Sequence, residues 1–113
     1  MNIGILNEKL GIVVIDSLDD LGYIQTQQIK KQLPVGAELK DLAFFYMPDR
    51  DWIVINKSHI LYDFYSQIIP TYLELSEKSR KECIAEVPAD AIKRAFCILD
   101  DVILSRQLKI SAP

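Results

Sequence analysis

The chain has 113 residues, the size of one domain, and half of them are hydrophobic, which argues against disorder over most of its length. The chain has a net charge of −3, so it lacks the basic surface that nucleic-acid binding needs. No stretch reaches the roughly 18 apolar residues of a membrane span, and no signal-peptide pattern opens the chain. We therefore expect a cytoplasmic protein with one domain over residues 1–113.

The first predicted element is a short buried strand over residues 10–15, which are apolar and mostly β-branched. The alternative for this run is the middle of a buried helix, because periodicity does not separate the two. Ser17 then has the character of a helix N-cap, and Pro34 ends a further short turn. Residues 34–41 combine proline, glycine and charged side chains, which predicts a loop.

A β-hairpin is predicted over residues 42–56. Its first run, residues 42–47, is rich in aromatic side chains, and its second, residues 52–56, is rich in β-branched ones. The turn-forming residues 48–51 lie between them. Both runs are apolar on both faces, so we expect helices to cover the sheet.

The C-terminal half is predicted to be helical. Apolar residues at helical spacing predict a helix over 58–69, which Ser58 caps and Pro70 kinks or breaks. Residues 74–86 are polar and form helix or loop on the surface. The spacing predicts a last helix over about 88–107, followed by a frayed tail at about 109–113.

These elements indicate an α+β fold. We predict a small, mostly antiparallel sheet that holds the hairpin at about 42–56 and the possible strand at 10–15, packed by three to four helices. The alternative is an all-α bundle in which residues 10–15 are helical and 42–56 are partly so.

Catalytic chemistry has little support in the sequence. His59 is the single histidine, and Asp63 would approach it if both lay on one helix. Cys83 or Cys97 could add a thiol, but no spacing requires these groups to meet. The glycines form no phosphate-binding loop, and no metal-ligand spacing occurs. We expect no catalytic residue, no cofactor and no metal, and we expect His59 to be a surface or capping residue.

Residues for binding a partner are easier to nominate. A compact, charged hairpin tip is a common place for recognition, although a solvated turn is the simpler interpretation. Aromatic side chains anchor protein interfaces, although most of those between 44 and 72 should pack in the core. The predicted partner-binding residues are Asp49, Arg50, Asp51, Trp52, Tyr62, Asp100 and Asp101.

The functional hypothesis is a non-enzymatic protein that occludes the surface of another protein. A toxin-neutralising immunity protein and an inhibitor encoded by a mobile element are examples. Its acidic residues would steer it toward a partner with a basic surface. One alternative is a homo-oligomeric structural or adaptor protein, such as a homodimer, that buries Leu104 and Leu108 between chains. The other is a small enzyme that uses His59.

Overall fold

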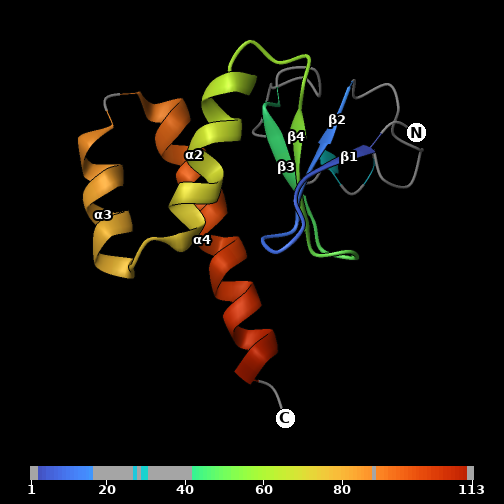
Figure 1. The fold of residues 1–113 in the computed structure, drawn as a ribbon. Helices are drawn as coiled ribbons and strands as arrows, with labels where there is room; N and C mark the ends of the chain where they lie inside the picture. The colour runs from blue at the N-terminus through green and yellow to red at the C-terminus, as the bar shows by residue number, and fades with distance from the viewer. Residues whose placement is uncertain (1–2, 17–26, 28, 31–41, 88, 112–113) are drawn as a thin grey trace. The chain divides into compact units, whose positions relative to one another are not determined.

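The computed structural model describes residues 3–16, 27, 29–30, 42–87 and 89–111. In that part of the chain it forms four strands and three helices, which confirms the α+β fold and excludes the all-α bundle (Figure 1). The elements are β1 Ile3–Asn7, β2 Ile12–Ile15, β3 Phe44–Met47, β4 Trp52–Asn56, α2 Tyr62–Glu74, α3 Glu77–Glu86 and α4 Asp90–Ser111.

The strands form one mixed sheet in the order β1-β2-β4-β3. The two outer pairings, β1 with β2 and β3 with β4, are antiparallel, whereas the central strands β2 and β4 run parallel. In the central pair Val13 lies opposite Val54, and Val54 also lies opposite Phe45. The predicted hairpin and the predicted strand at 10–15 are therefore confirmed, and β1 is an additional edge strand.

The two hairpins are built in the same way. Each has a four-residue turn, residues 8–11 in the first and 48–51 in the second. Each turn ends on a residue with positive φ, 67° at Gly11 and 55° at Asp51. Glycine adopts this conformation without a steric penalty, and aspartate is among the few other residues that tolerate it. Because β2 and β4 are parallel, both turns lie at the same end of the sheet.

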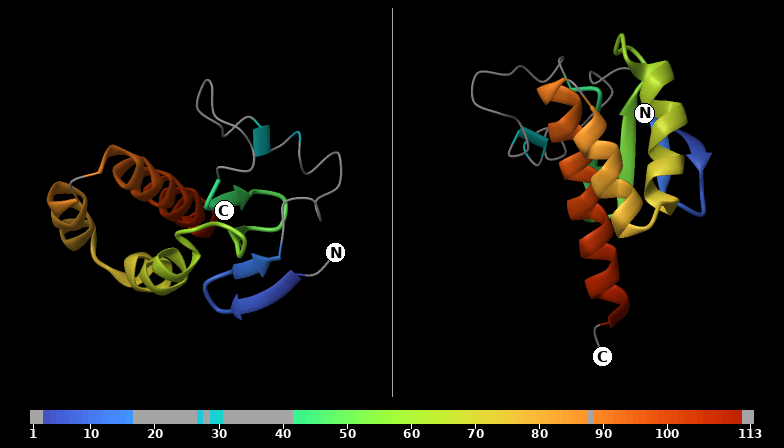
Figure 2. Two further views of the ribbon diagram at one scale, coloured as in Figure 1. Left: turned by 90° about the horizontal axis from the view of Figure 1, so that it is seen from above. Right: turned by 90° about the vertical axis from the view of Figure 1, so that its left-hand side faces the viewer.

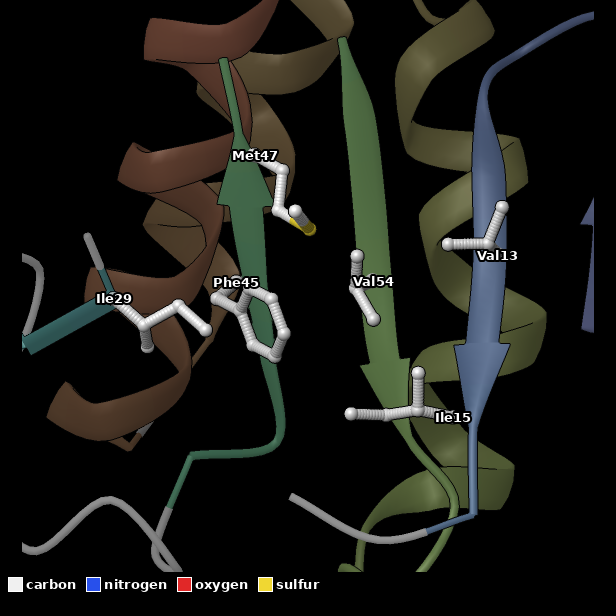
Figure 3. Packing of buried hydrophobic residues seen from close by; sticks show 6 residues of the cluster. All are labelled: Val13, Ile15, Ile29, Phe45, Met47 and Val54. Carbon is white, nitrogen blue, oxygen red and sulfur yellow. The ribbon is translucent and has the colours of Figure 1, made fainter. Parts of the chain in front are cut away.

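One face of the sheet carries a cluster of buried apolar side chains (Figure 3). Alternate residues along each strand point to the same face, so every second residue of β2, β3 and β4 contributes. We call this group the inner cluster; it consists of Val13, Ile15, Ile29, Phe45, Met47 and Val54, with Leu42 and Trp52 packed partly buried against it.

The opposite face is buried as well, so β2, β3 and β4 carry buried side chains on both faces, as expected for the hairpin. Ile12, Ile53 and Ile55 are fully buried there. The ring of Phe44 packs edge-on against Tyr65 near the start of α2, with centroids 5.2 Å apart. The last residue of β4, Asn56, is buried but satisfied: its amide nitrogen donates to the Leu42 carbonyl, and its amide oxygen accepts from the Ser58 N–H.

The described residues group into two compact units, 1–70 and 71–113, with α2 running through the boundary. The sheet belongs to the first unit, and α3 and α4 belong to the second. Within the second unit, α4 is much longer than α3 and extends past it toward the C-terminus (Figure 2). None of the helices in the described ranges has the length and apolar character needed to cross a membrane.

Several helix boundaries differ from the prediction. Helix α2 begins at Tyr62 rather than at 58, because residues 57–61 form a turn in which the Ser58 hydroxyl donates to the Asp16 carbonyl instead of capping the helix. The helix also continues through Pro70 to Glu74, so the predicted break is absent. Helix α4 covers Asp90–Ser111 rather than 88–107. The cap predicted at Ser17, the turn before Pro34 and the loop 34–41 lie outside the described residues.

Candidate protein-recognition surface

The tip of the β3–β4 hairpin is a turn with its own internal bonds. The Asp51 N–H donates to the Pro48 carbonyl at 3.3 Å and closes the turn. The Tyr46 hydroxyl on β3 donates to Asp51 Oδ1 at 2.6 Å. Since Asp51 also adopts the left-handed backbone conformation, its side chain and its backbone both fix the shape of the turn.

The same tip presents an arginine stacked on a tryptophan. The Arg50 guanidinium carbon lies 5.0 Å from the centre of the Trp52 ring, within the range of a cation–π contact. Trp52 is half-buried and packs against the inner cluster, whereas Arg50 is exposed. The cation is therefore held on a ring that the core itself anchors.

The turn of the first hairpin lies beside this tip. The Gly11 carbonyl accepts from the Ile53 N–H at 2.8 Å, which joins the start of β2 to the start of β4. The Leu10 N–H donates to the Asn7 side chain at 3.0 Å and orders the turn. Glu8 and Lys9 are exposed there. We call the two adjacent turns, residues 8–11 and 48–51, together with Trp52, the turn surface.

Tyr62 lies away from the turn surface. Strand β4 runs from the hairpin tip to Asn56, and the chain then turns into α2, so Tyr62 begins that helix at the other end of the sheet. Of the predicted partner-binding residues in the first unit, the structure therefore groups Asp49, Arg50, Asp51 and Trp52 and separates Tyr62 from them.

Asp100 belongs to a polar network inside the second unit. Its Oδ1 atom accepts from the Tyr72 hydroxyl at 2.9 Å and from Arg80 Nε at 3.1 Å. Arg80 Nη1 also donates to the Leu75 carbonyl at 2.8 Å. The Asp100 carboxylate thus joins residues of α2, α3 and α4, while the neighbouring Asp101 is exposed.

The environment of Tyr72 is strongly apolar apart from this network. Its ring is fully buried and stacks on Phe96, with centroids 4.7 Å apart and planes 12° from parallel. Burial, followed by the hydrogen bond to Asp100 and the negative charge of that carboxylate, raises the pKa of Tyr72 well above its ordinary value. The phenol therefore stays protonated and remains a hydrogen-bond donor.

A shallow depression lies beside the network. Its volume is about 470 Å³, and its apolar lining comes from Leu75, Ile103 and Leu104. Its charged lining consists of Arg80 with Asp100 and Lys81 with Glu77. Both charged pairs are salt bridges, at 3.1 and 3.3 Å, so the depression offers no uncompensated charge to a ligand.

The residues considered for catalysis come from separate elements of the fold. His59 lies in the turn before α2 rather than on the helix, and its Nδ1 atom accepts from the Leu61 N–H at 3.0 Å. It is therefore a local capping residue, as expected. Cys83 on α3 and Cys97 on α4 are free thiols of the second unit. No cluster of three or more His, Cys, Asp or Glu residues suited to a metal occurs within the described ranges.

Sequence reasoning missed two parts of these surfaces. The first is the turn at 8–11, although Asn7 and Gly11 before a β-branched run carry the same signal that identified the second hairpin. The second is the network of Tyr72, Arg80 and Asp100. Its members are 8 and 20 residues apart along the chain, so no local pattern links them.

Comparisons of the chain with protein-family models, with curated proteins and with solved structures found no match.

Proposed function

We propose that the protein is a non-enzymatic, cytoplasmic binding protein that occludes the surface of another protein through the turn surface. The observation that carries this proposal is the Arg50–Trp52 pair. Tryptophan, tyrosine and arginine are the residues that most often dominate the binding energy of protein interfaces. Here an arginine and a tryptophan are paired at an exposed hairpin tip.

Rigidity of the tip supports the same proposal. Ordering a rotamer-rich side chain on binding costs about 0.5–1.5 kcal/mol, and this cost falls when the free protein already holds it in place. Stacking on Trp52 restricts Arg50, and the bond from Tyr46 to Asp51 restricts the turn that carries it. A partner would then meet a surface that needs little rearrangement.

The charges of the turn surface suggest the kind of partner. Glu8, Asp49 and Asp51 are acidic, and Lys9 and Arg50 are basic, which leaves one net negative charge on a chain that is acidic overall. Such a surface favours a partner with a basic patch, and it would steer that partner during encounter. A toxin blocked by its immunity protein, or a host protein blocked by a mobile-element inhibitor, fits this description.

The test begins with a partner recovered in stoichiometric amount from the native cell, whose affinity is then measured by calorimetry. Arg50→Ala should weaken binding by roughly tenfold or more, which corresponds to about 1.4 kcal/mol or more, because truncation of an interface hot spot has this effect. The matched control is Lys57→Ala, which removes an exposed positive charge at the other end of the sheet and should leave the affinity unchanged.

Equal affinities for Arg50→Ala and the wild-type chain would refute the turn surface as the binding site. Recovery of a small molecule that the purified protein converts into a product would refute the non-enzymatic proposal as a whole.

A further inference from the structure

Helix α4 keeps one face exposed from Asp90 to Leu108. Residues at alternating spacings of three and four stay accessible on this face, whereas Ala95, Phe96, Leu99 and Val102 are buried on the other. We call the accessible row the α4 outer face; it consists of Asp90, Arg94, Cys97, Asp101, Leu104 and Leu108.

Two opposite charges of the α4 outer face, Arg94 and Asp101, lie seven residues apart. The midpoint between residues 97 and 98 lies halfway between Arg94 and Asp101. At a rise of 1.5 Å per residue, each of these two residues is about 5 Å from that midpoint along the helix axis. Both side chains are exposed, and neither takes part in an ion pair or hydrogen bond among the described residues.

From this arrangement we infer that the α4 outer face binds the same face of a second copy of the chain, with the two helices antiparallel about a two-fold axis beside Cys97. In such an isologous contact each residue meets its mirror position on the other copy. Arg94 of each copy then lies level with Asp101 of the other, so two ion pairs form symmetrically on either side of the axis.

The competing antiparallel arrangement centres on the exposed leucines. An axis at Leu104 would place the two copies of this leucine in contact, but Asp101 would then lie level with Gln107. Arg94 would have no counterpart in the facing helix, because its mirror position falls beyond Ser111, the last residue of α4. Of these two arrangements, only the axis beside Cys97 pairs both charges.

Leu104 takes part at the ends of this contact. With the axis beside Cys97 it lies level with residue 91 of the second copy, whereas Leu108 extends past Asp90, the first residue of that helix. A single pair of helices buries less than the roughly 1,600 Å² of a standard stable interface. The dimer should therefore dissociate on dilution.

Cys97 provides a direct probe of the axis. Packed helices have axes 8–10 Å apart, and Cα atoms lie about 2.3 Å from each axis, so facing Cα atoms come within the distance that a disulfide spans. Diamide, which is reduced to a hydrazine as it joins two thiols, should cross-link the wild-type chain and Cys83→Ser into dimers. Cys97→Ser should stay monomeric on a non-reducing gel.

A charge-swap series tests the pairing without the cysteine. Sedimentation equilibrium over a concentration series should show dimers for the Cys97→Ser chain. Arg94→Asp alone and Asp101→Arg alone each place like charges together and should raise the dimer dissociation constant at least tenfold. The double variant restores opposite charges and should restore dimerisation. All of the substituted side chains are exposed, and circular dichroism verifies that the fold is retained.

The inference is overturned if the chain remains monomeric over the whole concentration series, in which case a different protein covers this face. It is equally overturned if Cys83 rather than Cys97 supports the cross-link, or if the double variant is no better than the single ones. None of these results bears on the turn surface, which is tested through Arg50.

Discussion

At the scale of single residues, the carboxylate of Asp100 is the centre of the polar network in the second unit. It accepts hydrogen bonds from Tyr72 and from Arg80, so one side chain joins three helices. Arg80 is only 14% exposed and also donates to the carbonyl of Leu75. A partly buried charge that is paired and hydrogen-bonded in this way becomes costly when either partner is removed. Asp100 is thus occupied within the chain, unlike Asp101.

Tyr72→Phe tests the energetic role of this network. Removing the hydroxyl should lower the free energy of unfolding by about 1 kcal/mol at neutral pH, because Asp100 loses one donor but keeps Arg80. Urea denaturation measures this change. Tyr62→Phe, which removes a hydroxyl from a half-exposed ring, is the matched control and should have a smaller effect.

Comparing the wild-type chain with Tyr72→Phe also tests a pH dependence of stability. The raised pKa of Tyr72 means that folding favours the neutral phenol. Its contribution is complete below the ordinary tyrosine pKa of about 10 and is lost as the pH rises through the folded-state pKa. Between about pH 8 and about pH 11 the wild-type chain should therefore lose more stability than Tyr72→Phe does. Parallel stability curves for the two proteins would contradict this assignment.

At the scale of elements, α3 differs from the other helices because none of its described residues is buried. It depends instead on local interactions. The Ser76 hydroxyl caps its N-terminus by accepting from the Ser79 N–H at 3.2 Å, and Lys81 pairs with Glu77 one turn away. Arg80 supplies its link to α4. A helix held in this way should open more readily than α2 or α4.

Ser76→Ala should therefore act mainly on α3. Loss of an N-cap hydroxyl costs about 1 kcal/mol of helix stability. Amide hydrogen exchange should quicken across Glu77–Glu86, with a much smaller change in α4. Ser105→Ala, on α4, is the control and should leave exchange in α3 as it is. Uniform acceleration over the whole chain after Ser76→Ala would show that α3 does not open separately.

At the scale of the whole molecule, α2 is the element that the two compact units share. Residues up to Pro70 belong to the unit with the sheet, and Thr71–Glu74 belong to the unit with α3 and α4. Pro70 removes one N–H from the helix and yet does not end it. Because helix formation is cooperative along the chain, a helix that continues through the boundary couples the unfolding of both sides.

We accordingly expect the chain to unfold as one domain. Trp52 is the single tryptophan and reports on the sheet unit, whereas far-ultraviolet circular dichroism reports mostly on the helices. The urea transitions followed by the two signals should coincide, as they do in a two-state domain. Two separate transitions, with the fluorescence change and the dichroism change at different midpoints, would show that the units unfold independently.

The predictions of β2, β3 and β4 rested on local signals, whereas β1 was not predicted. Residues 12–15 and 52–56 are rich in β-branched side chains, and the second run follows a turn built of proline and aspartate. The helix over the last part of the chain was predictable for the same reason, since its apolar residues recur at helical spacing. The start of α2 was not, because Ser58 has the character of a cap but bonds to the distant Asp16 carbonyl instead.

The candidate surfaces likewise contain features that follow from local sequence and features that depend on the tertiary structure. By itself the sequence predicted the α+β class, strand β4 and the charged hairpin tip, since each follows from neighbours along the chain, and it left residues 10–15 open between a strand and a buried helix. Only the tertiary structure decided that β2 pairs in parallel with β4, which places the 8–11 turn beside that tip. It also decided that Asp100 bonds to Tyr72 and Arg80. Such contacts join residues far apart in sequence, and their energies depend on the packing that brings the residues together.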